Sequence, residues 1–350
     1  MNVVFLYHDA LAPGGYPRDV RWLAGNLSEL GVDVTVLGRP GPLNDGLGSA
    51  TVVDRAESWA DAIQDGPVLH AFGISNRVQL DALRGLAPGA SRLVFSPLAH
   101  MMREHLRVGS ALKRPAYRMA GAWLNRHRAI GHFFSIVEQQ ESAPYFAPRS
   151  SFIAGAGVFP DDAGDGRMAG NERYLLFFGR NDVNQKGLDL LIEGYGMARA
   201  GGLDLPLVIG GRAHGDSESF LRTATQRAEV GDSISLLGET SDEERSRLMA
   251  GADAFIFPSR WDGPPRPVRE AIALGVPVLV TPGTNMAEVV AEHDAGAVIE
   301  PTAAGVRDAL LRLIDAKEVE RWRQNSPKLR EALSWPTLAR SYLSAYEGGA

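Results

Sequence analysis

Short apolar runs rich in β-branched and aromatic residues alternate along the chain with longer segments in which apolar residues recur every three or four positions. The short runs predict strands that are buried on both faces, and the longer segments predict amphipathic helices. The first helical segment ends at Gly31, a residue typical of helix C-termini. Its apolar face is formed by Val20, Leu23, Leu27 and Leu30. This alternation is typical of parallel sheets built from βαβ units.

The predicted strands fall into two groups, separated by a polar, glycine-rich stretch at residues 160–166 that is typical of a linker. The first group comprises residues 3–7, 32–37, 68–72, 93–96, 133–137 and 152–154. The second group comprises residues 175–178, 207–209, 234–237, 254–257, 276–280 and 297–299. The helices predicted after the linker include residues 188–200, 242–250, 266–274 and 335–346.

We therefore expect two doubly wound α/β domains of similar size. The N-terminal domain would span residues 1–160 and the C-terminal domain residues 161–330. Residues 331–350 are predicted to form a helix that crosses back to the first domain. Doubly wound sheets bind ligands beyond the carboxyl ends of their strands, so a site is expected in a cleft between the two domains.

The composition is that of an ordinary globular protein. Of the 350 residues, 45% are hydrophobic and 22% are charged, which excludes a disordered chain or a fibrous repeat. The absence of cysteine excludes a disulfide framework, a thiolate metal site and a cysteine nucleophile. The apolar runs are far shorter than the roughly 18 residues that span a bilayer, and the chain starts like a strand, so we expect a cytoplasmic protein. A formal net charge of −6 argues against nucleic-acid binding.

A glycine pair, Gly14-Gly15, follows the first predicted strand and directly precedes a helix. Glycine lets the backbone pass close to a ligand, and the free N–H groups at the start of a helix attract anions. The pair predicts either an anion-binding turn or an ordinary tight turn between a strand and a helix.

Two cations lie six residues apart after the first strand of the second group. Arg180 follows the end of that strand, and Lys186 lies near the start of the next helix. Lysine is scarce in this chain, which has four lysines among 36 basic residues. Two cations so placed can bracket a diphosphate through charge-assisted hydrogen bonds, each worth on the order of 1.5–3 kcal/mol. The alternative is a solvated arginine and an ordinary exposed lysine.

Two carboxylates lie eight residues apart in a later strand–loop–helix segment. Asp262 lies on a loop rich in glycine and proline, and Glu270 lies in the opening turns of the following helix. Ionised carboxylates are strong hydrogen-bond acceptors, so the two could hold sugar hydroxyls. The alternative for Glu270 is a favourable interaction with the helix dipole.

Residues 281–288 repeat the order of strand, glycine loop and helix. The N–H groups at this helix start would form a cradle for phosphate, although the segment lacks the lysine of a P-loop. The alternative is a plain turn with a helix cap.

Taken in this order, the four motifs resemble the retaining GT-B glycosyltransferases of family 4, of the glycosyl transferases group 1 type. The resemblance covers nearly the whole chain and is strongest over residues 174–300. Gly-Ala-Asp-Ala-Phe-Ile-Phe-Pro-Ser at 251–259 and Glu-Ala-Ile-Ala-Leu-Gly-Val-Pro-Val at 270–278 are also typical of the family. In the first half the resemblance depends on the glycine pair, the helix after it and the segment at 155–158. It implies the GT-B fold, two Rossmann-like domains that face each other across a cleft.

The resemblance implies an enzyme that moves a hexose from a nucleotide diphosphate sugar, of the UDP or GDP type, to a hydroxyl acceptor. The acceptor would be a cell-surface polysaccharide, a glycolipid or a secondary metabolite. Anomeric configuration would be retained, and neither a metal nor a further cofactor is implied. As the catalytic residues, Arg180 and Lys186 would neutralise the leaving diphosphate and Asp262 would contact donor-sugar hydroxyls. Glu270 would hold the ribose. The remaining donor contacts would come from Gly15, Gly263, Arg266, Gly283, Thr284 and Asn285.

Three departures from the family pattern leave other functions open. Asp262 is one methylene shorter than the usual glutamate. Pro264 and Pro265 lack the N–H groups that related enzymes offer to the sugar, so the Arg266 side chain would have to compensate. The histidine that many relatives carry after the fourth strand is displaced, with His100 as the candidate here. The alternatives are a catalytically silent scaffold that binds glycans or protein partners, and another GT-B enzyme such as a nucleotide-sugar epimerase.

Residues 100–128 carry seven arginines and lysines against one carboxylate. Apolar residues interleave with them at helical spacing, which predicts a basic amphipathic helix. Such a helix either docks peripherally on the anionic inner face of a membrane, receives an anionic or lipid-linked acceptor, or packs its apolar face on its own domain. The candidate acceptor residues are His100, Arg114 and Arg118.

Overall fold

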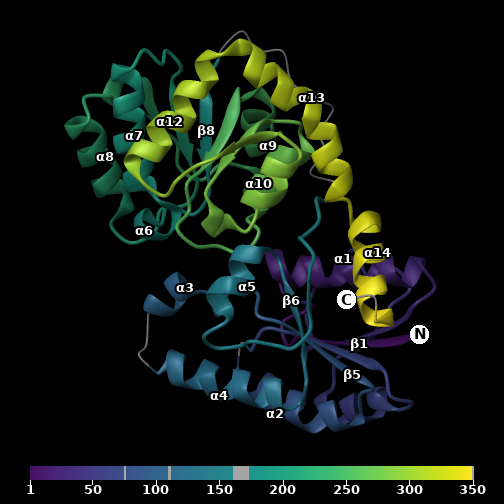
Figure 1. Cartoon of the computed structure of the whole chain (residues 1–350). Helices are drawn as coiled ribbons and strands as arrows, with labels where there is room; N and C mark the ends of the chain where they lie inside the picture. The colour runs from purple at the N-terminus through teal and green to yellow at the C-terminus, as the bar shows by residue number, and fades with distance from the viewer. Residues whose placement is uncertain (75, 109–111, 161–172, 349–350) are drawn as a thin grey trace. The chain divides into compact units, whose positions relative to one another are not determined.

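The computed structural model describes residues 1–74, 76–108, 112–160 and 173–348, and the chain divides into two compact units (Figure 1). Unit 1 comprises Met1–Gly157 and Ser334–Ala350, and unit 2 comprises Val158–Leu333. The predicted boundaries, after residues 160 and 330, lie close to both crossings of the chain. The Val158 N–H donates to the Leu333 carbonyl oxygen (2.9 Å), so the segment that enters unit 2 is hydrogen-bonded to the segment that leaves it. Residues 161–166 of the predicted linker lie outside the described residues.

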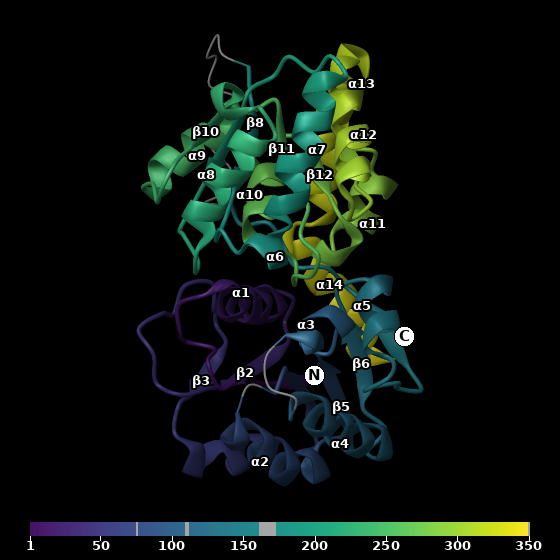
Figure 2. The same ribbon diagram turned by 90° about the vertical axis from the view of Figure 1, so that its left-hand side faces the viewer.

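Unit 1 is built on a seven-stranded parallel sheet in the order β3-β2-β1-β4-β5-β6-β7. Its strands are β1 Asn2–Leu6, β2 Asp33–Leu37, β3 Thr51–Val53, β4 Val68–Phe72, β5 Arg92–Ser96, β6 Ile130–Phe133 and β7 Ser151–Ile153. The strand order reverses between β1 and β4, as in doubly wound sheets. Helices α1 (Gly15–Glu29) and α14 (Trp335–Glu347) lie side by side on one face (Figure 1). Helices α2 (Arg77–Leu86) and α4 (Lys113–Arg126) cover the other face (Figure 2).

A buried chain of hydrogen bonds attaches α14 to the sheet of unit 1. Ser96 Oγ on β5 lies 2.6 Å from His70 Nε2 and 2.5 Å from His132 Nδ1. The other ring nitrogens reach the hydroxyls of Tyr346 (2.6 Å) and Tyr342 (2.8 Å) on α14. Burial lowers the pKa of both histidines, so the imidazoles are neutral at pH 7 and act as paired donors and acceptors. The last helix is therefore part of unit 1, although 176 residues of unit 2 precede it in the chain.

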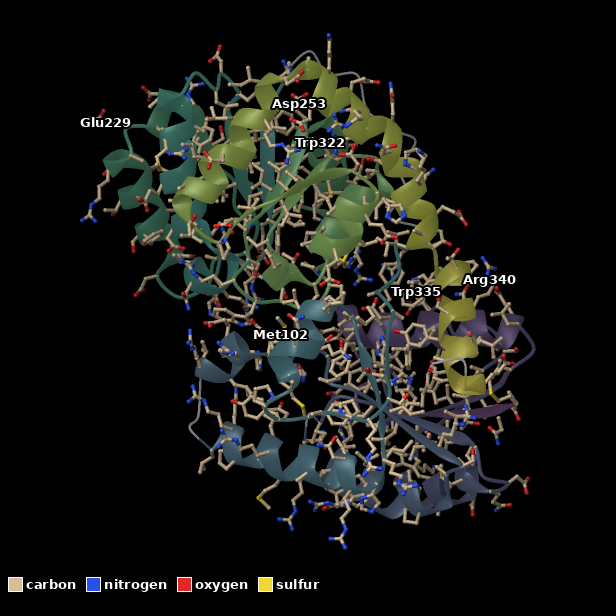
Figure 3. The ribbon with its side chains drawn as sticks, viewed as in Figure 1. Met102, Glu229, Asp253, Trp322, Trp335 and Arg340 are labelled. Atoms are coloured by element: carbon tan, nitrogen blue, oxygen red, sulfur yellow. The ribbon has the colours of Figure 1, made fainter. Side chains whose placement is uncertain are left out.

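Unit 2 is built on a six-stranded parallel sheet in the order β10-β9-β8-β11-β12-β13. Its strands are β8 Leu175–Phe178, β9 Leu207–Gly210, β10 Ile234–Leu236, β11 Ala254–Phe257, β12 Val278–Val280 and β13 Gly296–Val298. Helix α13 (Ala316–Ala332) packs against the core of unit 2 through Trp322, which is fully buried (Figure 3). The strand order reverses between β8 and β11, so the loops after these two strands flank the position where such sheets bind ligands.

The two predicted doubly wound α/β units are confirmed, and most predicted strands match to within two residues. The strand predicted over 133–137 is wrong except for Phe133, the last residue of β6. Ser135 Oγ accepts from the Glu138 N–H (3.0 Å) and starts helix α5 (Ile136–Ser142), so β6 ends before it. Strand β3 was not predicted, because its two apolar residues, Val52 and Val53, form too short a run between Thr51 and Asp54. In the described part of the chain, no helix combines the length and the hydropathy needed to cross a membrane.

Candidate functional site

The turn after β8 holds the first predicted cation. Arg180 follows the carboxyl end of the strand, and its guanidinium contacts the side-chain oxygen of Gln185 and lies 3.5 Å from a carboxylate oxygen of Asp182. Asp182 caps the short helix α6 (Val183–Lys186) by accepting from the Gln185 N–H (3.0 Å). The guanidinium is thus held in place at the strand end while 44% of the side chain remains exposed to a ligand.

Lys186 and Asp262, which were predicted in separate motifs, are in direct contact. Gly187, after α6, has a φ of +66°, and a Cβ at this position would collide with the Pro258 carbonyl oxygen, so only glycine fits. This close approach brings Lys186 to the loop after β11, where its ammonium forms an ion pair with the Asp262 carboxylate. The same ammonium lies 5.1 Å from the centre of the Phe257 ring. The fold therefore brings two residues that lie 76 positions apart in the sequence into one ion pair.

The electrostatics of Asp262 are those of a carboxylate withdrawn from water. Burial raises the pKa of Asp262, while the nearby charges of Lys186 and Arg180 and the N–H of Gly263 act in the opposite direction. Lys186 and Asp262 leave only 10% and 19% of their side chains exposed. Since a buried charge is tolerated only when it is paired, each member of this pair depends on the other.

The predicted phosphate loop after β12 supports the Asp262 loop. The Asp262 N–H donates to the Gly283 carbonyl oxygen (2.7 Å), and Asn285 Nδ2 donates to the Asp262 carbonyl oxygen (2.6 Å). The Thr284 hydroxyl is fully buried and donates to the Thr281 carbonyl oxygen (2.7 Å). These side chains hold the site together. Direct contact of Gly263, Gly283, Thr284 and Asn285 with a donor remains a prediction.

Arg260 supports the loop that carries Asp262, a role that was not predicted from the sequence. It donates two hydrogen bonds to the Asp189 carboxylate on α7 (Leu188–Ala200), at 2.8 and 2.6 Å, and one to the Asn184 carbonyl oxygen (2.8 Å). These contacts lock the loop after β11 onto the turn that carries Lys186. A partner 71 residues away leaves no local signal in the sequence.

Glu270 lies between two arginines at the rim of a pocket. Its carboxylate lies 2.7 Å from Arg266 Nε and 3.1 Å from Arg245, and the residue is 5% exposed. The pocket has a volume of about 410 Å³ and is also lined by Arg180 and Arg212. It therefore joins three predicted donor residues, Arg180, Arg266 and Glu270, to two arginines that were not predicted. Arg245 lies on α9 (Asp242–Gly251), a helix that was predicted but not assigned to the site.

A second hollow continues from this pocket within unit 2. It has a volume of about 640 Å³ and shares Gly211, Arg212 and Glu239 with the first. Its further lining includes the apolar side chains Ile209 and Leu221. The two hollows together combine a cationic end with a partly apolar end. Across the described residues, no group of three or more His, Asp or Glu side chains is arranged to hold a metal ion.

In unit 1, the two glycines before α1 differ in what requires them. Gly14 has a φ of +143°, a backbone conformation that disfavours other residues. Gly15 has ordinary helical geometry, and a Cβ there would meet no atom within 4 Å among the described residues beyond its own helix and neighbours. The fold thus explains Gly14, and Gly15 leaves open space at the helix start, as the predicted close approach of a ligand needs. In the segment at 155–158, a Cβ on Gly157 would overlap the Trp335 ring.

The three predicted acceptor residues lie in unit 1 and not in one cluster. His100 follows β5, and its ring lies 6.1 Å from that of Tyr16 and 5.3 Å from that of His105. Burial, followed by the neighbouring His105, lowers the pKa of His100 to about 4, so the free imidazole is neutral at pH 7. On α4, Arg114 Nε donates to the Leu106 carbonyl oxygen (3.1 Å), and the Arg118 guanidinium lies 5.8 Å from the centre of the Tyr145 ring.

Comparison with known proteins gives a match over unit 2. Residues 160–329 match the family model described as Glycosyl transferases group 1. O-antigen chain mannosyltransferase B of Escherichia coli is 27% identical over 179 residues, which cover 50% of this chain and 45% of that protein. GDP-mannose:cellobiosyl-diphosphopolyprenol alpha-mannosyltransferase of Xanthomonas oryzae pv. oryzae is 29% identical over 233 residues, which cover 64% and 58%. The chain spans about half the length of the curated relatives it matches.

Among solved structures, HepE of Anabaena in complex with UDP has a TM-score of 0.74 to this chain. The two share 16% sequence identity, and the match covers 99% of this chain and 100% of that one. At this level of identity the likeness shows a common fold over both units.

Proposed function

We propose, from the premise that residues 160–329 belong to the glycosyl transferases group 1 family, that this protein is a retaining glycosyltransferase. It moves a hexose from a nucleotide diphosphate sugar to a hydroxyl acceptor. The observation that carries the proposal is the Lys186–Asp262 ion pair at the point where the strand order of unit 2 reverses. Arg180 and the arginine-lined pocket adjoin this pair, so a diphosphate would meet fixed cations there.

The two hollows suggest how a donor would lie in unit 2. The diphosphate would contact Arg180 and Lys186, and the ribose would lie against Glu270 at the rim of the 410 Å³ pocket. The base would enter the second, partly apolar hollow. UDP in the HepE complex and GDP-mannose in the name of the Xanthomonas relative support a nucleotide-linked hexose as the donor class.

In the proposed reaction, the bond between the anomeric carbon and the β-phosphate oxygen breaks. The acceptor oxygen bonds to the same carbon on the same face, and its proton passes to the leaving phosphate oxygen. Negative charge grows on the diphosphate during this step, and Arg180 and Lys186 would stabilise it. One preorganised donor of this kind is typically worth about 10²–10³ in kcat. Because two fixed cations serve this purpose, we propose that transfer needs no metal and is unaffected by EDTA.

Thermal unfolding with a panel of nucleoside diphosphates, in EDTA, tests donor binding. A ligand that binds only the folded state, at 100 times its Kd, raises the free energy of unfolding by about 2.7 kcal/mol. We expect the nucleoside diphosphate with the matching base to raise the Tm. Glu270→Gln should weaken the binding of that nucleoside diphosphate by about tenfold, since a hydrogen bond to a charged group contributes about 1.5–3 kcal/mol. Pyrophosphate, which has no ribose, should bind both proteins alike.

Glu243→Gln, on the exposed side of α9, is the matched control and should leave every affinity unchanged. A panel in which no nucleoside diphosphate raises the Tm would favour the silent scaffold. Interconversion of nucleotide sugars without any acceptor would favour the epimerase. Inversion at the anomeric carbon of the transfer product, observed by NMR, would contradict retention.

We also propose that the basic face of unit 1 contacts an anionic bilayer. Three large apolar side chains are exposed there: Val108 (49%), Leu112 (75%) and Met119 (69%). They alternate with the exposed arginines of α3 (Arg103–Arg107) and α4. Apolar groups that insert into the headgroup region, flanked by arginines that attract anionic lipid, are the features of an interfacial helix.

Co-sedimentation with phosphatidylglycerol vesicles tests this contact. Each basic residue near an anionic surface contributes about 1 kcal/mol, so reversing Arg114, Arg118 and Arg126 to Glu should reduce binding by at least about a hundredfold. Reversal of three exposed arginines elsewhere is the control: Arg227, Arg247 and Arg340. Equal binding by both triple variants would contradict the proposal.

A further inference from the structure

The turn after β5 has a strained backbone. Leu98 and Ala99 have φ values of +55° and +60°, although neither is glycine. Left-handed conformations cost free energy in residues with a Cβ, and two in succession persist only where the surroundings impose them. Such positions concentrate at functional sites, so the turn and the side chains next to it are a candidate site.

Two side chains from neighbouring helices, α1 and α5, hold the turn. Tyr16 Oη, directly after the glycine pair, donates to the Leu98 carbonyl oxygen (3.0 Å). The fully buried Glu138 carboxylate accepts from the N–H groups of Ala99 and Phe134, both at 2.6 Å. The turn is therefore attached to the first turns of α1 and α5, at the edge of the sheet where the carboxyl ends of the strands meet.

The strained turn presents a cluster of basic groups. His100 is its next residue, and its ring lies 5.3 Å from that of His105 on α3. Lys113, the first residue of α4, interacts electrostatically with both rings. Within the described ranges, none of these three side chains makes a hydrogen bond or an ion pair to a protein group. The three side chains are each partly exposed and have no counter-charge among the described residues, so they lie ready for an external anion.

The carboxylates of the neighbouring elements are engaged elsewhere. Glu104 pairs with Arg107 at 2.6 Å. Glu141 on α5 accepts from the Arg103 N–H and faces the same arginines. As a result, the three basic groups act only on one another: besides burial, His105 and Lys113 lower the pKa of His100, and Lys113 lowers that of His105. An anion at this place would reverse the direction of these effects.

We propose that His100, His105 and Lys113 form a subsite for a phosphate group of the acceptor. Imidazole N–H groups and an ammonium together donate to the oxygens of a phosphate monoester or diphosphate, and they carry compensating charge. The inference rests on the proposed function, because it assigns the chemical class of the acceptor. The phosphate can be carried by a soluble molecule or by a lipid, and the chemistry at the three side chains is the same.

NMR of histidine ring nitrogens tests the subsite, because the signals report on His100 and His105 individually. Pyrophosphate added to the full chain should raise the pKa of His105 by about one unit, that is, tenfold in proton affinity. Lys113→Gln should raise the pKa of both histidines in the free protein. It should also weaken the binding of pyrophosphate at this site by about tenfold. Lys328→Gln, an exposed lysine on α13 outside both proposed sites, is the matched control and should change neither.

Vesicles separate the two sources of phosphate. Signals that move with pyrophosphate in solution but not with vesicles assign a soluble acceptor. Signals that move only with phosphatidylcholine vesicles containing phosphatidic acid, and are lost in Lys113→Gln, assign a lipid-borne one. Signals that move with neither, or equally in Lys113→Gln and Lys328→Gln, overturn the subsite.

Binding of nucleoside diphosphates to unit 2, measured on the same samples, separates this inference from the proposed function. If they bind and the histidine signals stay unmoved, only the subsite fails. If they do not bind while pyrophosphate still moves the histidine signals, the transferase proposal fails and with it the assignment of this phosphate to an acceptor.

Discussion

Lys186→Met is expected to lower kcat/KM for sugar transfer by at least about 10²-fold, because it removes a fixed cation from the growing charge of the leaving diphosphate. Methionine keeps most of the volume of the lysine stem, so the change is largely one of charge. Initial rates at several donor concentrations measure the effect. Lys328→Met, an exposed lysine on α13 in the same unit, is the matched control and should keep wild-type activity.

The same substitution affects stability, and a second variant separates the two effects. Lys186→Met leaves the Asp262 carboxylate buried without its partner, and breaking a buried ion pair typically costs about 3–5 kcal/mol. In Lys186→Met/Asp262→Asn both members are neutral, so most of the lost stability should return. Activity should stay low in this double variant. Recovery of activity together with stability would show that Lys186 has a structural role only.

Asp262→Asn is expected to lower kcat by about 10²-fold with a smaller change in the KM of the donor. The amide keeps the shape of the side chain but removes the charge that balances Lys186 and accepts from the sugar. Burial raises the pKa of Asp262, so wild-type activity should fall on the acid side at a higher pH than an ordinary aspartate would give. That acid limb, measured in a pH profile of kcat, should disappear in Asp262→Asn.

Asp262→Glu distinguishes the length of the side chain from its charge. The family pattern that the sequence resembles has a glutamate at this position, so the longer carboxylate should retain more activity than the amide. Equal activity of Asp262→Asn and the wild type would contradict a role of the carboxylate in the reaction and favour the silent scaffold.

Local patterns in the sequence were sufficient for most of the fold. The apolar run at 175–178 predicts β8 correctly because a strand buried on both faces has a continuous apolar sequence. The prediction over 133–137 fails because Ile136 and Val137 are β-branched and resemble a strand, whereas the Ser135 cap starts a helix there. Here a single side-chain hydrogen bond outweighed intrinsic preference.

The candidate site was found in part. Arg180, Lys186 and Asp262 could be identified because each follows a predicted strand, and the carboxyl ends of parallel strands share one edge of a sheet. The contact between Lys186 and Asp262 depends on the close approach at Gly187. The pairing of Glu270 with Arg245 depends on how α9 lies against α10 (Arg266–Ala273).

The sequence by itself therefore determined the element types, the division into two α/β units and the strand ends at which charged residues gather. It could do so because buried strands, amphipathic helices and helix caps each leave a signal within a few residues. Only the tertiary structure decided which charges are paired, that Arg260 locks the loop of Asp262, and that His100, His105 and Lys113 lie together without a counter-charge. These contacts join residues from separate elements, and their formation depends on packing and burial, which no local pattern records.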